Sequence, residues 1–208
     1  MAEAAVTVVG AGLAGSEAAW QIARRGVPVS LYEMRPGRPT PVHSTGHMAE
    51  LICSNSMKSL ELTSAHGLLK EEIRRLGSLI LDHALRHRLP AGAALAVDRE
   101  RFALSVTEAL EGHPLVTVRR EELLEVPAAG PVILAAGPLV SDSLAAAIAG
   151  FTGQDYLYFY DAIAPVIESD SIDREIVYAA SRYGKGGGDD YLNCPMNREE
   201  YDLSLIHI

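Results

Sequence analysis

Short apolar runs alternate with helical spacing over the first part of the chain. The run at residues 6–9 (VTVV) has the length of a buried strand, and the apolar residues after it recur at helical spacing as far as Arg25. A second apolar run starts at Val27, and an acid, Glu33, closes it. A strand, a helix and a second strand joined by short connections form a βαβ unit, which predicts an α/β fold with a parallel sheet.

The same alternation continues to about residue 150. Apolar residues recur at helical spacing after a capping residue, Ser64. The same spacing predicts helices at Ser78–Arg88, Arg99–Leu110 and Ser141–Ala149, the last with Ser141 as its cap. Apolar runs predict further strands at Ala93–Val97, Leu115–Arg119, Leu123–Val126 and Pro131–Ala136, of which the last is expected to be buried.

After Gly150 the pattern becomes β-rich. Tyrosine occupies every second position of 156–160, Ala162–Ile167 is apolar, and Ile176–Ala180 is another β-like run. The glycines at 184–188 lack the spacing of a phosphate-binding loop and predict a flexible turn.

A short glycine motif lies between the first strand and the first helix. It reads Gly10-Ala11-Gly12-Leu13-Ala14-Gly15, and an acid follows about 20 residues on, which is the complete context of a dinucleotide-binding loop. Gly10 allows the tight turn, Gly12 leaves room for a pyrophosphate, and Gly15 lets the helix pack closely. The helix N-terminus adds N–H groups and a positive dipole end.

The acid and two other residues complete the expected cofactor site. Glu33 suits ribose hydroxyls and would repel a 2′-phosphate, which favours FAD or NAD over NADP. Arg35 is expected beside it, and Gly137, after the strand at 131–136, is expected where the chain returns beside the dinucleotide. The alternatives are a βαβ unit that binds nothing and an ordinary strand end at Gly137.

Composition narrows the possible partners and the compartment. The formal net charge of −9 argues against a surface that attracts nucleic acid over its whole extent. Basic clusters exist, and solvated helix faces are their ordinary interpretation; they are Arg24-Arg25, Arg35 with Arg38, Arg74-Arg75, Arg86-His87-Arg88, Arg99 with Arg101, and Arg119-Arg120. No apolar run approaches the length of a membrane span, no leader is visible, and two cysteines make no disulfide framework, so we expect a cytoplasmic protein.

The segment Met34–Ser59 predicts a long ordered loop, and it carries the residue best suited to covalent chemistry. Cys53 has polar neighbours and Lys58 nearby in sequence, and a cation beside a thiol favours the thiolate. A buried structural cysteine is the alternative. His43 and His47 either line a pocket or are ordinary loop residues. Cys194 is interpreted as structural, and no spacing predicts a metal site.

Several blocks together resemble one family: GAGLAGSEAAWQIARRG, HSTGHMAELICSNSMKS, LPAGAALAVDRERFA, AAGPLVSD, YFYDAIAPVIESDSID and DYLNCPMNREEY. This combination resembles the folate- and FAD-dependent tRNA uracil-5-methyltransferases. The resemblance implies a flavoprotein that transfers a methylene group from 5,10-methylenetetrahydrofolate to a uridine in the tRNA T-loop, with NAD(P)H as reductant. It also implies a catalytic role for Cys53 at the flavin and the uracil.

The chain departs from that family in length, since family members are roughly twice as long. Their second mechanistic cysteine would lie beyond Asp202, and Cys194 does not match it. The last six residues match one reading frame of a transposase adapter used in DNA sequencing libraries. We therefore expect a natural sequence that breaks off in mid-domain, and we expect residues 1–208 alone to be poorly soluble and inactive.

The sequence thus predicts an α/β fold: an FAD-binding, Rossmann-like, three-layer domain followed by the start of an inserted β-rich domain, truncated. The expected divisions are 1–150 for the dinucleotide-binding domain, 151–202 for the start of the substrate domain, and 203–208 for a foreign tail. Two other functions stay open, namely a different FAD oxidoreductase acting on a small molecule and an inactive nucleotide-binding fragment.

Overall fold

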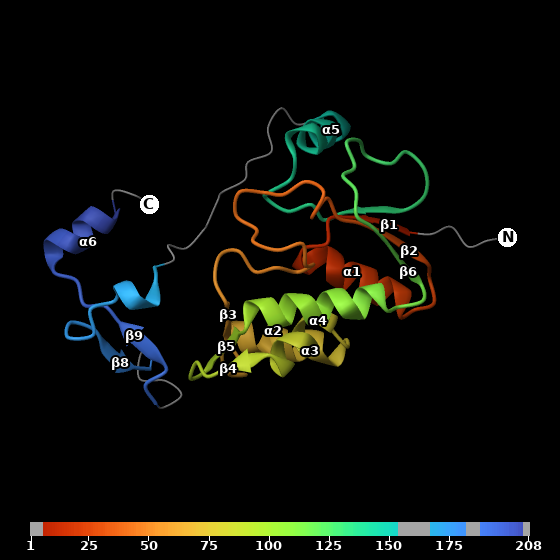
Figure 1. Cartoon of the computed structure of the whole chain (residues 1–208). Coiled ribbons are helices and arrows are strands. Elements are labelled where there is room, and N and C mark those ends of the chain that lie inside the picture. Colours follow the sequence, from red (N-terminus) through yellow and green to blue (C-terminus); the bar gives the residue numbers. More distant parts are fainter. Residues whose placement is uncertain (1–5, 154–166, 182–187, 206–208) are drawn as a thin grey trace.

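A four-stranded parallel sheet forms the centre of the molecule (Figure 1). The computed structural model describes residues 6–153, 167–181 and 188–205. The strands lie in the order β6-β2-β1-β7, with bounds β1 Val6–Val9, β2 Val29–Tyr32, β6 Val116–Arg119 and β7 Val132–Leu134. The chain moves outward from β1 to β2 and β6 and then returns to the other side of β1 as β7. The carboxyl ends of β1 and β7 therefore form the point where the strand order reverses, which is where such sheets bind ligands.

The two faces of this sheet differ in polarity because the strands alternate. Val8, Leu31 and Val116 lie on the buried face, where α1 (Leu13–Ala23) and α4 (Arg99–Glu111) cover the sheet and complete the main hydrophobic core. Thr7 and Ser30 pair on the opposite face and are only half-buried. The sheet and helix layers agree with the three-layer prediction. On the polar side, Figure 1 shows the helix α5 (Asp142–Thr152) as the third layer.

Two helices and a second, antiparallel sheet pack beside α1 and α4. The helices are α2 (Ala65–Arg75) and α3 (Leu79–Arg86), and the sheet has the order β3-β5-β4, with bounds β3 Ser56–Ser59, β4 Arg88–Leu89 and β5 Ala94–Val97. Ser64 caps α2 as predicted, since its hydroxyl accepts from the N–H of Gly67 at 3.0 Å. Glu17 of α1 accepts from Ser78 Oγ at 2.7 Å and from the N–H of Ile80 at 3.0 Å, so a carboxylate docks the N-terminus of α3 onto α1.

The described C-terminal segments form a separate small unit, and they contact the main body at the loop that contains Ala91 and Gly92. It contains a 3₁₀ turn at Ser169–Ser171, the antiparallel hairpin of β8 (Tyr178–Ala180) and β9 (Tyr191–Asn193), and α6 (Arg198–Leu205). Tyr191 donates its hydroxyl to the carbonyl of Ala91 at 3.2 Å, and the carboxylate of Asp190 accepts from the N–H of Gly92. The predicted domain boundaries stay predictions, and α6 crosses the one at 202.

Several predicted elements differ from the structure. The strand at 131–136 is shorter and not buried: β7 pairs only with β1, and Ile133 on this edge strand is 38% exposed. Residues 123–126, within the described part of the chain, form a connection rather than a strand. The long loop ends in β3 because residues 56–59 pair with β5. The predicted tyrosine strand at 156–160, most of the apolar run at 162–167 and most of the turn at 184–188 lie outside the described residues. Within the described ranges, no helix combines the length and apolarity that crossing a membrane requires.

Candidate functional site

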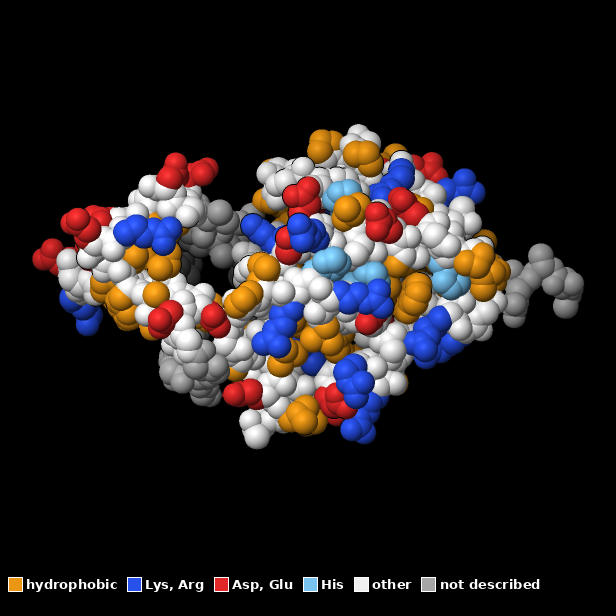
Figure 2. Space-filling view, turned by 60° about the horizontal axis from the view of Figure 1, so that its bottom comes forward, with side chains coloured by type: hydrophobic (Ala, Val, Ile, Leu, Met, Phe, Trp, Pro, Cys, Tyr) orange, Lys and Arg blue, Asp and Glu red, His pale blue; other side chains and the backbone are white. Residues whose placement is uncertain are grey.

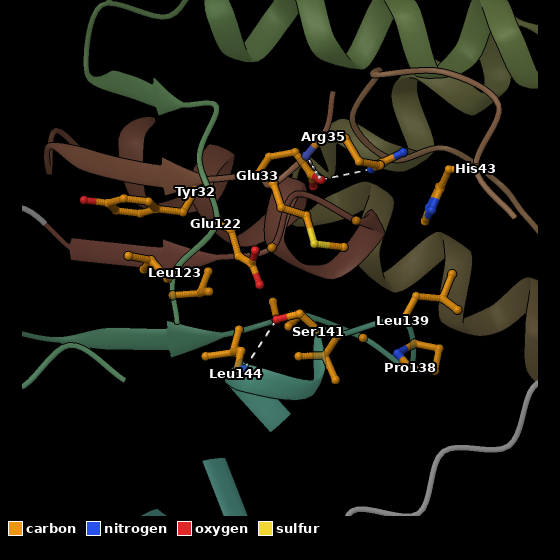
Figure 3. A pocket seen from close by; sticks show the side chains of 18 of the residues that line it. Tyr32, Glu33, Arg35, His43, Glu122, Leu123, Pro138, Leu139, Ser141 and Leu144 are labelled. Carbon is orange, nitrogen blue, oxygen red and sulfur yellow. Dashed lines mark hydrogen bonds and ion pairs between the residues drawn. The ribbon is translucent and has the colours of Figure 1, made fainter. Parts of the chain in front are cut away.

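A pocket of about 250 Å³ lies at the carboxyl ends of β1, β2 and β7. Figure 3 shows Glu33 and Arg35 on one side, Pro138, Leu139, Ser141 and Leu144 on the other, and His43 from the long loop at the end. The glycine loop, the residues after β2, the 121–123 segment and the residues after β7 all contribute to its lining. The pocket therefore lies where the order of the strands places a ligand site.

A different structural feature explains each of the three glycines of the motif. Gly10 has φ +94°, and a Cβ there would lie 2.5 Å from the carbonyl oxygen of Ala135. A Cβ on Gly15 would overlap the carbonyl oxygen of Gly10. Gly12 differs, because a Cβ there would meet nothing within 4 Å, and the residue lines the pocket. The fold requires Gly10 and Gly15, whereas the space at Gly12 is open to the pocket.

Two helix N-termini face this pocket. Gly12 is the N-cap of α1 and provides no side-chain capping bond, while Leu13 and Ala14 of the first turn line the pocket. Ser141 caps α5 by accepting from the N–H of Leu144 at 3.4 Å, and both residues line the pocket. The unpaired first-turn N–H groups and the dipole ends favour a negatively charged group, such as a phosphate.

A buried ion network connects the acid after β2 to the long loop. Glu33 accepts from the backbone N–H of Ala11 at 3.0 Å and from Arg35 Nε at 2.9 Å, and Arg35 Nη1 donates to Glu50 at 3.0 Å. The side chains of Arg35, Glu33 and Glu50 are only 4%, 6% and 10% exposed. Arg35 lines the pocket, but two carboxylates hold its guanidinium. Its main contact in the structure is therefore with the acids, and its role in binding the cofactor stays a prediction.

Glu50 organises the segment 43–50. Its carboxylate accepts from the N–H of Ser44 at 2.8 Å and from the hydroxyl of Thr45 at 2.7 Å. Burial raises the pKa of Glu50, but these hydrogen bonds outweigh burial and hold it below its usual value, so the group stays ionised at neutral pH. Burial, and then the charge of Arg35, lower the pKa of His43, which stays neutral at pH 7 and lines the pocket as a polar, uncharged ring.

Backbone contacts anchor the long loop directly to the glycine loop. The N–H of Ala49 donates to the carbonyl of Ala11 at 2.8 Å, and the N–H of Met48 donates to the hydroxyl of Thr107 in α4 at 2.8 Å. Met48 and Ala49 are fully buried. Arg120 donates to the carbonyl of Gly46 at 2.8 Å from the other side. The loop that carries Cys53 is thus ordered, as predicted, by contacts distant in sequence.

The segment after β6 forms the rim of the pocket. Arg38 of the long loop pairs with Glu122 at 2.6 Å, and the hydrogen bond from Arg38, with a further one from Ser141, lowers the pKa of Glu122. Glu122 therefore connects three separate segments around the pocket, as its central position in Figure 3 indicates.

Cys53 is exposed and lies next to the pocket rather than in its lining. Its neighbour Ile52 lines the pocket, whereas the thiol itself does not. The alternative of a buried structural cysteine is therefore wrong for this residue. The interpretation of Cys194 as structural has no support from burial either, since it is exposed after β9. The structure describes no contact between Lys58 and Cys53.

The predicted cofactor residues divide into two groups. Gly10, Gly12, Leu13, Ala14, Glu33, Arg35 and Gly137 line the pocket, whereas Ala11 and Gly15 are buried behind it. Gly137 has φ +69°, and no atom lies within 4 Å of its absent Cβ, so the backbone angle accounts for this glycine. Sequence reasoning missed Glu50, Thr107 and Arg120, because their contacts span 15 to 74 residues and no local pattern marks them. Among the described residues, no group of three or more His, Cys, Asp or Glu side chains is placed to hold a metal ion.

Two proteins with sequences similar to this chain are named as methyltransferases. The chain is 59% identical to methylenetetrahydrofolate–tRNA-(uracil-5-)-methyltransferase TrmFO of Heliobacterium modesticaldum. The alignment covers 95% of this chain and 45% of that protein. The protein of the same name from Symbiobacterium thermophilum is 61% identical over 97% of this chain and 45% of its own length. The chain thus spans less than half the length of these curated relatives, and the matches confirm the resemblance drawn from the sequence.

A solved structure and a family model agree with this relationship. The structure of Aquifex aeolicus GidA in its form II crystal matches with a TM-score of 0.50 at 18% identity, over 62% of this chain and 21% of that one, which supports the fold alone. The model of the family described as glucose inhibited division protein A matches residues 5–207. Because this match covers nearly the whole sequence, the chain belongs to the glucose inhibited division protein A family.

Proposed function

We propose that this chain is part of an FAD-dependent enzyme that methylates a uridine in the T-loop of tRNA, with 5,10-methylenetetrahydrofolate as the carbon donor. The observation that carries the proposal is the identity of 59% and 61% to two proteins named for that reaction, over a region that includes the glycine loop and Cys53. We use "full-length protein" below for a protein that extends this chain to the length of those relatives.

The residues at the pocket fit the adenosine diphosphate part of FAD. The open position at Gly12 and the free N–H groups of the first turn of α1 suit a pyrophosphate. Glu33 Oε1 accepts from the backbone N–H and from the Nε of Arg35, whereas Oε2 accepts only from the N–H of Ala11 and keeps a lone pair for a ribose hydroxyl. Arg35 then acts as a positioning residue that fixes the carboxylate of Glu33. When bound, the flavin supplies the electrons that reduce the transferred carbon to a methyl group.

Cys53 is the residue that we assign to covalent catalysis. Its thiol is exposed and lies one residue beyond Ile52, which lines the pocket. A thiolate adds to an electron-poor carbon of a pyrimidine ring, and this addition makes the neighbouring ring carbon nucleophilic. The fixed backbone at Ala49 holds the loop that presents this thiol.

The reductant and the compartment belong to the same proposal. We assign NAD(P)H as the reductant of the flavin, tRNA and the folate as substrates, and the cytoplasm as the location. A different FAD oxidoreductase that acts on a small molecule is the second candidate, because the net charge of −9 disfavours RNA over most of the surface.

Flavin analysis and nucleoside analysis of the full-length protein test the proposal together. We expect a yellow protein that releases FAD and that forms 5-methyluridine in unmodified tRNA when methylenetetrahydrofolate and NADH or NADPH are supplied. Bound FAD without any 5-methyluridine would favour the small-molecule oxidoreductase. A colourless protein that gains no flavin on incubation with FAD would contradict the assignment of the pocket.

A further inference from the structure

The basic side chains of this protein differ in whether a carboxylate forms an ion pair with them. Many arginines form ion pairs with nearby carboxylates: Arg38 with Glu122, Arg74 and Arg75 with Glu71, Arg86 with Asp82, Arg101 with Asp98, and Arg120 with Glu111. Lys58, Lys70 and Arg99 form no ion pair within the described part of the chain. Lys70 donates to the carbonyls of Ser59 at 3.0 Å and His66 at 3.2 Å, and Arg99 donates to the carbonyl of Leu51 at 3.3 Å.

These three cations, which we call the cationic track, lie on both sides of the stretch that carries Cys53. The last residue of β5, Val97, donates its N–H to the carbonyl of Asn55 at 2.9 Å, directly before β3 begins. Arg99 comes two residues after Val97 and therefore lies near the start of β3. Lys58 belongs to β3, and Lys70 binds the carbonyl at its other end. With a rise of up to about 3.3 Å per residue, the two ends of β3 are at most about 10 Å apart. The exposed residues 53–56 lie in sequence between Leu51, which accepts from Arg99, and Ser59, which accepts from Lys70.

Among the residues that the structure describes, no carboxylate forms an ion pair with the cationic track. Asp98, next to Arg99, accepts from the N–H of Arg101 and pairs with its guanidinium, and Glu71, next to Lys70, is held by Arg74 and Arg75. Burial, and then the charge of Lys58, lower the pKa of Lys70, so the two ammonium groups repel each other. Figure 2 shows the side of the main body that lies at the bottom of Figure 1, and several Lys and Arg side chains gather there. A negatively charged partner would relieve this repulsion.

We propose that Lys58, Lys70 and Arg99 bind phosphates of the RNA strand that carries the target uridine, and that they hold this strand across residues 53–56. This inference rests on the proposed function and adds the surface that receives the RNA. Three separated cations, on β3, α2 and α4, suit a chain of repeated phosphates, whereas a small anion would need donors that converge on one point. Because this chain carries a formal net charge of −9, it attracts RNA only at local basic surfaces, and this one orients the RNA with its bases beside Cys53.

The test compares two variants of the full-length protein that lose the same charge. One is the triple variant K58Q/K70Q/R99Q, and the matched control is R74Q/R75Q/R86Q, whose three arginines already have carboxylate partners. The dissociation constant for unmodified tRNA is measured against salt concentration. Each lost phosphate contact lowers the slope of log K against log salt by about 0.7, so we expect a loss of about 2 in the triple variant. The control should keep the wild-type slope.

Lys58→Gln alone provides a second measurement, since the Lys58 side chain donates no hydrogen bond to any residue in the described ranges. Its slope should fall by about 0.7. Flavin content and thermal midpoint should stay at the wild-type values in Lys58→Gln, and this variant decides the test if the triple variant is destabilised by the loss of its three hydrogen bonds to backbone carbonyls. Unchanged slopes and an unchanged KM for tRNA in both Lys58→Gln and the triple variant would overturn the inference while leaving the methyltransferase intact. If the wild-type protein neither binds nor methylates tRNA, it is the proposed function that fails, and this inference fails with it.

Discussion

At the scale of single residues, the glycine loop contains glycines that the fold requires and a glycine that we assign to ligand binding. Gly10 and Gly15 approach other backbone atoms too closely for any side chain, whereas Gly12 faces open space. The same motif therefore contains two structural glycines and one that is free to change without any clash inside the protein. This difference gives mutations at the three positions distinct expected effects.

Gly12→Val should separate cofactor binding from folding. The new side chain meets no protein atom near its Cβ, so we expect the thermal midpoint without flavin to change little, with a capping loss of up to about 1 kcal/mol. It fills the space assigned to the pyrophosphate, so the full-length protein should purify without FAD. Gly150→Ala, also open, is the control that keeps its flavin. Stoichiometric FAD in Gly12→Val would show that the site assignment is wrong.

At the scale of elements, the Glu33–Arg35–Glu50 network connects the main sheet to the long loop. Replacing Arg35 by Met leaves two buried carboxylates without their cation, which should destabilise the protein by about 3 kcal/mol. Arg86→Met breaks an ion pair on the surface and should leave the urea midpoint unchanged. Equal midpoints for the two variants would mean that the buried network does not stabilise the loop.

Stability should also fall as the pH drops below neutral, and His83 of α3 should contribute to this. His83 is buried, its Nδ1 lies 2.9 Å from Ser105 Oγ, and burial and then Arg86 lower its pKa below 6.5. Between the folded and unfolded pKa values the unfolded chain binds more protons. The free energy of unfolding is therefore highest above about pH 6.5 and decreases as the pH falls through this range.

Urea unfolding from about pH 7.5 to about pH 5 measures this decrease. His83→Gln cannot take up the proton, so its midpoint should depend less on pH, while the exposed control His66→Gln should keep the wild-type dependence. Glu50 has a lowered pKa and stays ionised over this range, so its contribution is lost only in stronger acid. A His83→Gln variant with the full wild-type pH dependence would contradict the role of this histidine.

Much of the fold follows from local pattern, and much of the site does not. Short stretches of sequence predict the βαβ unit, the glycine loop and the caps Ser64 and Ser141, and the structure confirms them. The exposure of β7 and the contacts of Glu50 and Arg120 depend on residues far apart in the chain. Likewise, the sequence shows basic clusters, but only the structure shows which of these charges have a carboxylate partner.

At the scale of the whole molecule, we propose that one cofactor pocket and one RNA-facing surface act together. The pocket lies where the strand order reverses, and the long loop connects it, through the anchored Ala49, to Cys53 and the cationic track beyond. An acidic protein that acts on RNA then needs only a local basic surface, placed beside its nucleophile.

The most direct test of this account is the transfer of labelled carbon from methylenetetrahydrofolate to unmodified tRNA by the full-length protein. Wild type, Cys53→Ala and Cys194→Ala are compared at equal FAD content. Both cysteines are exposed, so neither change should affect folding. We predict labelled 5-methyluridine from wild type and from Cys194→Ala, and almost none from Cys53→Ala. Wild-type turnover in Cys53→Ala, or no label from wild type, would contradict the account.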